Sequence, residues 1–266
     1  MRRGLWLVVA AQCVFALAFA FDVAPLVDLW PFGGRGPLTS IFIGSIFAAA
    51  AASTAWCLLT GSVRALGGIA LDYTVILAPL GLYALWRSLG GDDSSAHLVV
   101  FGLVALAGAG MGVALLRTSL RAEWRDERPA PRLVLVSFAV FIALLLVVSG
   151  SLLLRVQVLP WPVTDDVSTA IGLMFLGAAA YFAYGLRERR WENAGGQLAG
   201  FLAYDAVLIV PFLKRLPDVP AEFRVELIVY TAVVVYSGLL ALWYLALDPR
   251  TRGRTAAVDA PAHVAA

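Results

Sequence analysis

Eight apolar stretches, each long enough to cross a lipid bilayer, fill most of the 266 residues of this chain. A helix of about 20 apolar residues spans the hydrocarbon core of a membrane. The stretches are continuous and show no alternation, so they predict helices and exclude the strands of an outer-membrane barrel. The predicted fold class is all-α, a polytopic membrane protein with eight transmembrane helices. The spans are 5–27, 39–60, 65–86, 98–116, 133–154, 168–186, 195–213 and 226–247.

The composition excludes a soluble domain. Hydrophobic residues make up 61% of the chain and charged residues 14%, against about 45–50% and about 25% in soluble domains. The formal net charge of +2 gives no basic field for nucleic acid. The expected partner is therefore the lipid bilayer, with other membrane subunits as candidates.

The arginines predict how the chain lies in the membrane. With eight spans, both termini fall on one side, and that side collects 14 of the 20 Lys and Arg residues. Positive charge marks the cytoplasmic side, so we expect both termini in the cytoplasm. The longest connection, 117–132, contains five arginines. It is interpreted as a solvated loop, with an interfacial helix as the alternative.

Two parts of the chain resemble each other. Residues 40–52 and 168–180 share seven of 13 positions, including Gly44 with Gly172. Further along, Gly67 and Asp72 match Gly200 and Asp205. Four spans are an even number, so the halves have the same orientation, and the repeat is parallel.

The repeat divides the chain into three parts. The expected domains are a first four-helix repeat over 1–132 and a second over 133–247. The remaining residues, 248–266, are rich in Ala and Pro and are predicted to form a disordered cytoplasmic tail.

A Trp-Pro pair precedes the second and the sixth spans. Trp30-Pro31 is followed by the letters PLTS at 37–40, and Trp161-Pro162 stands at the corresponding place in the second half. Tryptophan suits the headgroup region, so we interpret these segments as anchors. They resemble a group of bacterial, actinobacterial-type multi-pass membrane proteins with W-P-x-x-x-P-L-T-[AS]-like segments. The resemblance implies a membrane location and a shared fold, and it transfers no activity and no site residues.

Several kinds of chemistry lack their usual residues. The two histidines are His97, at the edge of a span, and His263, in the tail, so a haem-binding bundle is not expected. No HExxH, GxSxG or P-loop sequence occurs. The two cysteines, Cys13 and Cys57, stand in apolar runs and are interpreted as packing residues. We therefore expect no cofactor and no metal, and nothing here indicates an enzyme.

Asp72 and Asp205 are the candidate polar site. Both lie inside predicted spans, where an ionisable group costs roughly 2.5–3.5 kcal/mol on insertion scales and indicates a functional site. The neighbouring Tyr73 and Tyr204 are candidate hydrogen-bond donors. The structural alternative is that each carboxyl group is hydrogen-bonded and holds two helices together.

Two functions therefore stay open. The first is a membrane subunit or scaffold without enzymatic activity, and the alternative is a small proton- or cation-coupled transporter with its site between the repeats. A scaffold predicts aspartates that are buried and paired, whereas a transporter predicts aspartates that face a cavity.

Overall fold

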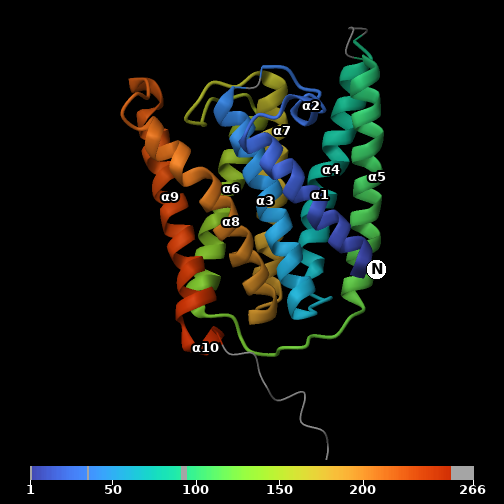
Figure 1. The fold of residues 1–266 in the computed structure, drawn as a ribbon, viewed down its shortest axis with the longest axis vertical. Helices are drawn as coiled ribbons and strands as arrows, with labels where there is room; N and C mark the ends of the chain where they lie inside the picture. Colours follow the sequence, from blue (N-terminus) through green and yellow to red (C-terminus); the bar gives the residue numbers. More distant parts are fainter. Residues whose placement is uncertain (1, 35, 91–94, 253–266) are drawn as a thin grey trace, which may run out of the picture.

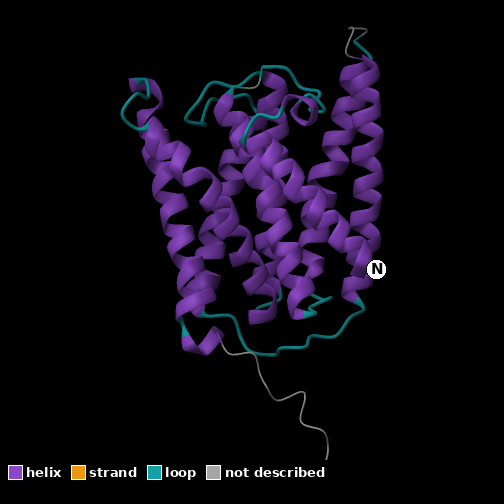
Figure 2. Cartoon of the chain, viewed as in Figure 1, coloured by secondary structure: helices purple, strands orange, loops and turns teal. Residues whose placement is uncertain are grey.

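The computed structural model describes residues 2–34, 36–90 and 95–252, and within these ranges the chain forms helices and no strand (Figure 2). Eight of the helical segments are long and apolar enough to cross a membrane, which confirms the predicted fold class. The long helices are α1 (Arg2–Ala20), α3 (Pro37–Thr60), α4 (Leu66–Ser88), α5 (Ser95–Leu120), α6 (Arg132–Leu153), α7 (Asp165–Arg187), α8 (Trp191–Arg215) and α9 (Arg224–Leu242).

Four short segments complete the described chain. They are α2 (Ala24–Val27), the 3₁₀ turn η1 (Ala221–Phe223), the π-helical turn η2 (Trp243–Leu247) and α10 (Pro249–Arg252). Because α10 is helical, the prediction of disorder from residue 248 onward is wrong for its first residues. The rest of that predicted tail, 253–266, lies outside the described residues.

The first predicted span, 5–27, is too long. Helix α1 ends at Ala20, and the backbone turns at Asp22 with a φ of 52°. The amide of Val23 then donates to the carbonyl of Ala18 at 2.8 Å, which satisfies a helix-end carbonyl and stops the helix. Apolar composition cannot reveal such a turn. Residue Arg155, with a φ of 62°, ends α6 in the same way.

The long helices pack as a bundle in which certain pairs are in close contact (Figure 1). Helix α1 packs on α3 and α6 on α7, while α4 packs on α5 and α8 on α9. Two further contacts join these pairs across the middle, α3 with α8 and α4 with α7. The bundle has two ends, and residues 21–34 and 154–164 lie together at the upper one in Figure 1, which we call the loop end.

Glycines let the central helices approach closely. A Cβ added at Gly195 of α8 would lie 2.6 Å from the Trp56 ring of α3. One added at Gly68 of α4 would lie 2.7 Å from the Tyr181 ring of α7. Small residues at such crossings are the usual device for packing helices inside a membrane, where lipid provides no hydrophobic drive.

The other end of the bundle is crossed by an extended segment, residues 121–131, which we call the strap (Figure 1). Helix α5 continues to Leu120, and the strap contains no helix, so the interfacial-helix alternative for this connection is wrong. The centre of the Trp124 ring, in the strap, lies 5.6 Å from the guanidinium carbon of Arg64 and 5.8 Å from that of Arg190. These cation–π contacts help to hold the strap against the ends of α4 and α8.

Glu192, in the first turn of α8, fixes the strap to the bundle. This side chain is buried, and its Oε2 atom accepts hydrogen bonds from the amides of Arg125 and Asp126, each at 2.7 Å. The amide of Ala130 donates to the carbonyl of Arg189 at 2.9 Å and extends the attachment. The backbone of the strap is therefore bonded to the second half of the chain.

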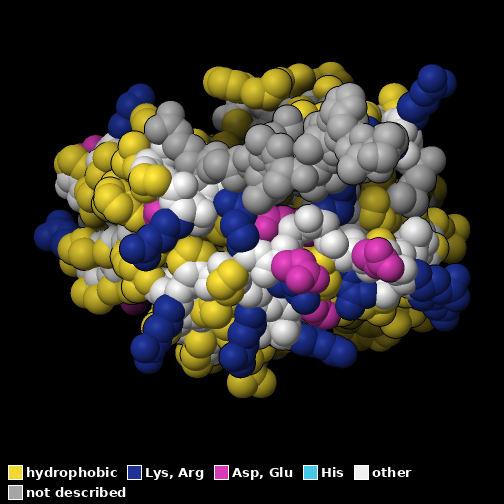
Figure 3. Space-filling view, turned by 90° about the horizontal axis from the view of Figure 1, so that it is seen from below, with side chains coloured by type: hydrophobic (Ala, Val, Ile, Leu, Met, Phe, Trp, Pro, Cys, Tyr) yellow, Lys and Arg dark blue, Asp and Glu magenta, His cyan; other side chains and the backbone are white. Residues whose placement is uncertain are grey.

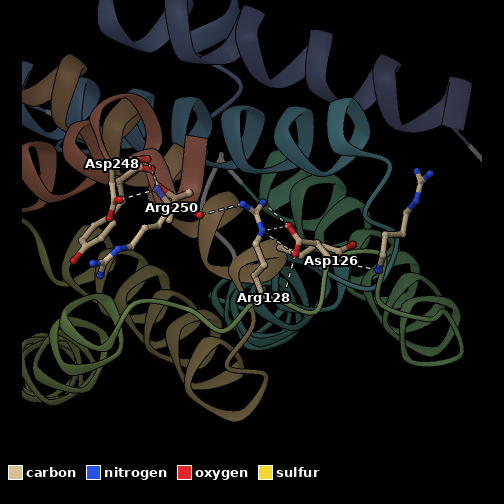
Figure 4. Close-up of polar contacts among 8 residues, drawn as sticks. Asp126, Arg128, Asp248 and Arg250 are labelled. Carbon is tan, nitrogen blue, oxygen red and sulfur yellow. Dashed lines mark hydrogen bonds and ion pairs between the residues drawn. The ribbon is translucent and has the colours of Figure 1, made fainter. Parts of the chain in front are cut away.

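The strap also contacts α10 at this end, which we call the strap end (Figure 4). Arg128 donates to both carboxylate oxygens of Asp126 and, through Nη1, to the carbonyl of Arg250 at 3.1 Å. The amide of Arg250 donates to Asp248 at 2.9 Å. Seen from this end, Lys and Arg side chains lie around the bundle, and acidic side chains gather nearer its middle (Figure 3).

Replacing Glu192 with Ala is expected to release the strap. Hydrogen bonds to a charged group contribute about 1.5–3 kcal/mol each, so loss of this carboxylate should expose the arginines of the strap to trypsin. We expect cleavage there to become at least tenfold faster in purified protein. Glu123→Ala, at an exposed position of the same strap, is the matched control, and equal cleavage of both variants would contradict this role of Glu192.

The contact between Asp126 and Arg128 should depend on pH. Burial alone would raise the pKa of Asp126, but the hydrogen bonds and charge of Arg128 lower it below its ordinary value. A lowered pKa stabilises the fold above the unfolded pKa of about 3.9, and this stabilisation is lost as the pH falls through the folded pKa. Hydrogen exchange of the strap, corrected for intrinsic rates, should therefore speed up only below about pH 4. Asp126→Asn should exchange faster at neutral pH and should lack the acid step attributable to this residue.

Candidate functional site

A cavity of about 360 Å³ lies inside the bundle, within the range of about 300–1,000 Å³ that is usual for small-molecule sites. It is formed by α3, α4, α6, α7, α8 and α9, together with residues 158 and 159 of a loop. Both predicted halves of the chain therefore contribute walls. Most lining side chains are apolar, and the polar ones are Ser53, Asp72, Tyr181, Gln197, Tyr204, Glu226, Tyr230 and Ser237.

Asp72 of α4 lines this cavity. Its Oδ1 atom is buried and has no hydrogen-bond partner within the described chain. Gly177 of α7 makes the position possible, because a Cβ there would lie 2.6 Å from this oxygen. An unpaired carboxyl oxygen away from water costs free energy unless something donates to it. Asp72 therefore places a carboxyl group, with one oxygen unpaired by the protein, in the wall of the cavity.

The neighbouring polar groups are mostly occupied by the protein. The amide Nε2 of Gln197 donates to the carbonyl of Tyr181 at 2.6 Å. The hydroxyl of Ser53 donates to the carbonyl of Gly196 at 3.0 Å and joins α3 to α8. Only Oε1 of Gln197, among these atoms, is buried without a partner in the described chain. Asp72 and Gln197 are therefore the side chains best placed to bind a ligand in this part of the cavity.

Tyr204 and Tyr230 form another part of the wall. Both line the cavity, one from α8 and one from α9, and their hydroxyl groups are hydrogen-bonded to each other. The pair joins the two helices and also leaves aromatic edges in contact with the cavity. Tyr204 therefore lies at the cavity, but its hydroxyl is bonded to Tyr230.

Asp205 is placed differently from Asp72. Its side chain is 4% exposed, and Oδ1 accepts a hydrogen bond from the hydroxyl of Ser237 at 3.0 Å. Oδ2 is buried without a partner in the described chain and lies beside Gly238, where a Cβ would be 3.4 Å from it. The carboxyl group thus connects α8 to α9 behind the cavity wall, and it does not line the cavity itself.

The sequence-predicted site is therefore separated into two places. Tyr73, next to Asp72 in sequence, points the other way and accepts a hydrogen bond from Gln12 of α1. Asp72 is six residues from the start of α4 and Asp205 is 14 from the start of α8, or about 9 and 21 Å at 1.5 Å per residue. Both helices begin at the strap end, so the two carboxyl groups lie at different depths.

Several residues of the cavity wall are not among the candidates that the sequence indicates. Glu226 begins the last predicted span, yet its Oε2 atom is buried without a partner in the described chain, and the side chain lines the cavity. Gln197 lies within a predicted span, where a polar amide is costly, so its position in the sequence does indicate a candidate site residue. Ser237 and Tyr230 carry no such signal, because hydroxyl groups are common on membrane helices.

Within the described residues, no group of three or more His, Cys, Asp and Glu side chains is arranged to hold a metal ion. His97 lies at the loop end of α5, where its Nε2 is 3.1 Å from the carbonyl of Leu29. It is remote from the cavity wall. His263 lies outside the described residues.

Comparison of the chain with models of protein families, with curated proteins and with solved structures gives no match.

Proposed function

We propose that this chain is a membrane carrier that binds a small amphipathic molecule through Asp72. The observation that carries the proposal is the buried, unpaired Oδ1 atom of Asp72 in the wall of a cavity. The apolar walls suit a hydrocarbon or aromatic body. The carboxyl group suits a cationic or hydrogen-bond-donating head, for which an ammonium group is the simplest example.

The two aspartates support different functions, and we favour the carrier because of this difference. Asp205 is buried and bonded to Ser237, as expected of a carboxyl group that holds helices together. Asp72 faces a cavity, as expected of a carrier. A scaffold would need no carboxyl group in the wall of a cavity, so the carrier is the better account of Asp72.

The repeat is part of this proposal and is supported by matching contacts. Gly44 of α3 packs on α1, and Gly172 of α7 packs on α6. Gly67 of α4 meets Tyr184 of α7, while Gly195 of α8 meets Trp56 of α3. One offset of 128 relates all of these residues, since 172 − 44, 195 − 67 and 184 − 56 are each 128.

The contacts thus suggest a different register from the sequence alignment. The alignment pairs Gly67 with Gly200, whereas the contacts pair it with Gly195. In the contact register, Asp72 corresponds to Gly200 and Gly177 to Ala49, since each pair differs by 128. Asp72 meets Gly177 at one central crossing, and Gly200 meets Ala49 at the other. The proposed carrier therefore has two related halves and one carboxyl group at its centre.

The proposed location is a bacterial inner membrane, with the strap end and both termini in the cytoplasm. The support is the distribution of Lys and Arg, 14 of 20 on the strap side of the predicted spans. The Trp-Pro segments and their resemblance to bacterial multi-pass proteins agree with this location.

Binding is expected to need the carboxyl group of Asp72. In lipid nanodiscs, we expect hexylammonium to raise the unfolding temperature and hexanol, of equal chain length, to have little effect. A ligand at 100 times its Kd stabilises a protein by about 2.7 kcal/mol. Asp72→Asn should fold normally and lose at least tenfold in affinity, because an amide cannot replace the charge of a carboxylate. Uptake of labelled hexyltrimethylammonium into proteoliposomes should fall in parallel.

Asp205 provides the matched control for that experiment. Asp205→Asn keeps a hydrogen-bond acceptor for Ser237 and should bind hexylammonium like the wild type, whereas Asp205→Leu should lower the unfolding temperature. Equal binding by Asp72→Asn and the wild type would reject Asp72 as the binding group. Absence of binding and uptake by the wild type would reject the proposed carrier and favour a scaffold.

Reporter fusions test the proposed orientation. Fusions after Thr60, Arg125 and Glu192 should report the cytoplasm, and fusions at Gly34 and Asp165 should report the outside, because arginine is concentrated on the strap side. Cytoplasmic signals at both Gly34 and Asp165 would reverse the orientation.

A further inference from the structure

We propose that the ligand reaches the cavity sideways from the bilayer, through an opening between α6 and α9 near the loop end. The ligand class is then a single-chain amphipath dissolved in the membrane leaflet on that side. This inference rests on the proposed carrier function for its ligand, while the opening itself can be tested without any ligand.

The cavity is covered at the loop end. Val158 and Leu159 form its wall there, and Leu159 is 1% exposed. The side chain of Gln157 holds this loop in place by donating to the carbonyls of Leu159 at 2.8 Å and Trp161 at 2.7 Å. The indole of Trp161 in turn donates to the hydroxyl of Thr39 at 3.0 Å. A loop bonded in this way obstructs direct access from the aqueous phase.

Aromatic side chains close the cavity toward the strap end. The rings of Phe182 and Phe201, which both line the cavity, are stacked with centroids 4.6 Å apart. Phe138 packs behind them, 5.0 Å from the ring of Phe182, and is fully buried. Beside these rings, Gln197 is also fully buried. A molecule in the cavity therefore has no open path to the strap end.

The side of the cavity between α6 and α9 is open. Leu144 of α6, with Val225 and Val229 of α9, line the cavity and are also 46%, 67% and 58% exposed on the outside of the bundle. A side chain can line the cavity and also be exposed on the outside of the bundle only where the cavity reaches the surface. These residues lie on helices that are long and apolar enough to cross a membrane, so the opening faces the lipid of the bilayer.

The two helices meet nearer the strap end. There the hydroxyl groups of Ser137 and Tyr236 are 2.7 Å apart, and the Tyr236 ring lies 6.1 Å from that of Phe141. These contacts close the boundary between α6 and α9 below the opening. The opening is therefore confined to the half of the membrane next to the loop end.

Glu226 supplies a polar group near the opening. It stands in the first turn of α9 and lines the cavity, and its buried Oε2 atom has no partner in the described chain. A head that donates hydrogen bonds can contact Glu226 at the depth of the lipid headgroups. Asp72 lies farther in, near the start of α4 at the strap end. The two carboxyl groups would bind the same class of head at successive positions, while the chain of the amphipath contacts the apolar walls.

Cysteine labelling in vesicles tests the opening directly. In a Cys13→Ser, Cys57→Ala background, a cysteine replacing Met174, which lines the cavity and is 6% exposed, should react with dodecylmaleimide dissolved in the bilayer. It should react at least tenfold more slowly with a charged, water-soluble thiol reagent. A cysteine replacing Ala70, which is fully buried and does not line the cavity, is the control and should react with neither.

Filling the opening should block this reaction. Val229→Trp places a large ring at the opening and is expected to slow labelling of the Met174 position at least tenfold. Val235→Trp, at an exposed position of α9 that does not line the cavity, should leave labelling unchanged. Both variants should unfold at the wild-type temperature, because each added ring lies on an exposed position.

The outcomes separate this inference from the carrier proposal. Faster labelling by the aqueous reagent, or equal labelling of the Val229→Trp and Val235→Trp variants, would overturn the lateral opening even if hexylammonium binds. Labelling that follows the expected pattern, without hexylammonium binding, would uphold the opening and reject the carrier.

Glu226→Gln should slow labelling by a cationic alkyl maleimide and leave labelling by the neutral one unchanged. Equal effects on the two reagents would exclude the role of Glu226 as the outer contact.

Discussion

In the hydrocarbon core of a membrane, a polar group has no water to bond with and must find its partner inside the protein. Most of the structure follows this rule. Thr54 and Thr74 donate to carbonyls one turn back in their own helices, and Asp205 is bonded to Ser237. Several buried side-chain atoms of the described chain lack a partner, and each has a cost. Among them, oxygens of Asp72, Glu226 and Gln197 belong to side chains that line one cavity, whereas Oδ2 of Asp205 lies away from it.

Close approach of helices places the first of these carboxyl groups. Gly177 has no side chain, so the carboxyl oxygen of Asp72 can lie against the backbone of α7. One turn toward the strap end, Gly68 meets Tyr181, which also lines the cavity. At the other central crossing, Gly200 leaves room for Ser53. The same small residues that bring the halves together thus determine which side chains face the cavity, so packing and site cannot be changed independently.

Hydropathy predicts the number and type of helices because the thickness of the bilayer fixes how long an apolar run must be. It predicts their ends less well, since the turn at Asp22 depends on one backbone conformation inside an apolar run. The cost of buried charge identified Asp72 and Asp205 correctly as residues inside the bundle. It could not tell which one faces a cavity, because that depends on the rotation of each helix against its neighbours. Glu226 was missed because its position at the edge of a span suggested water.

The two predicted halves differ at the loop end, and this difference places the proposed opening in the second half. In the first half, Trp30 and Phe32 fold inward and pack on Phe101 of α5, with ring centroids 6.0 and 5.7 Å apart. They occupy the space between α1, α4 and α5. In the second half, Trp161 packs instead toward the centre, on Phe42 and Phe212. The space between α6 and α9 is then left to the apolar side chains of the opening. A carrier needs access to its site and needs to exclude leaks elsewhere, so an aromatic filling in one half and an opening in the other is the arrangement that a single binding site would require.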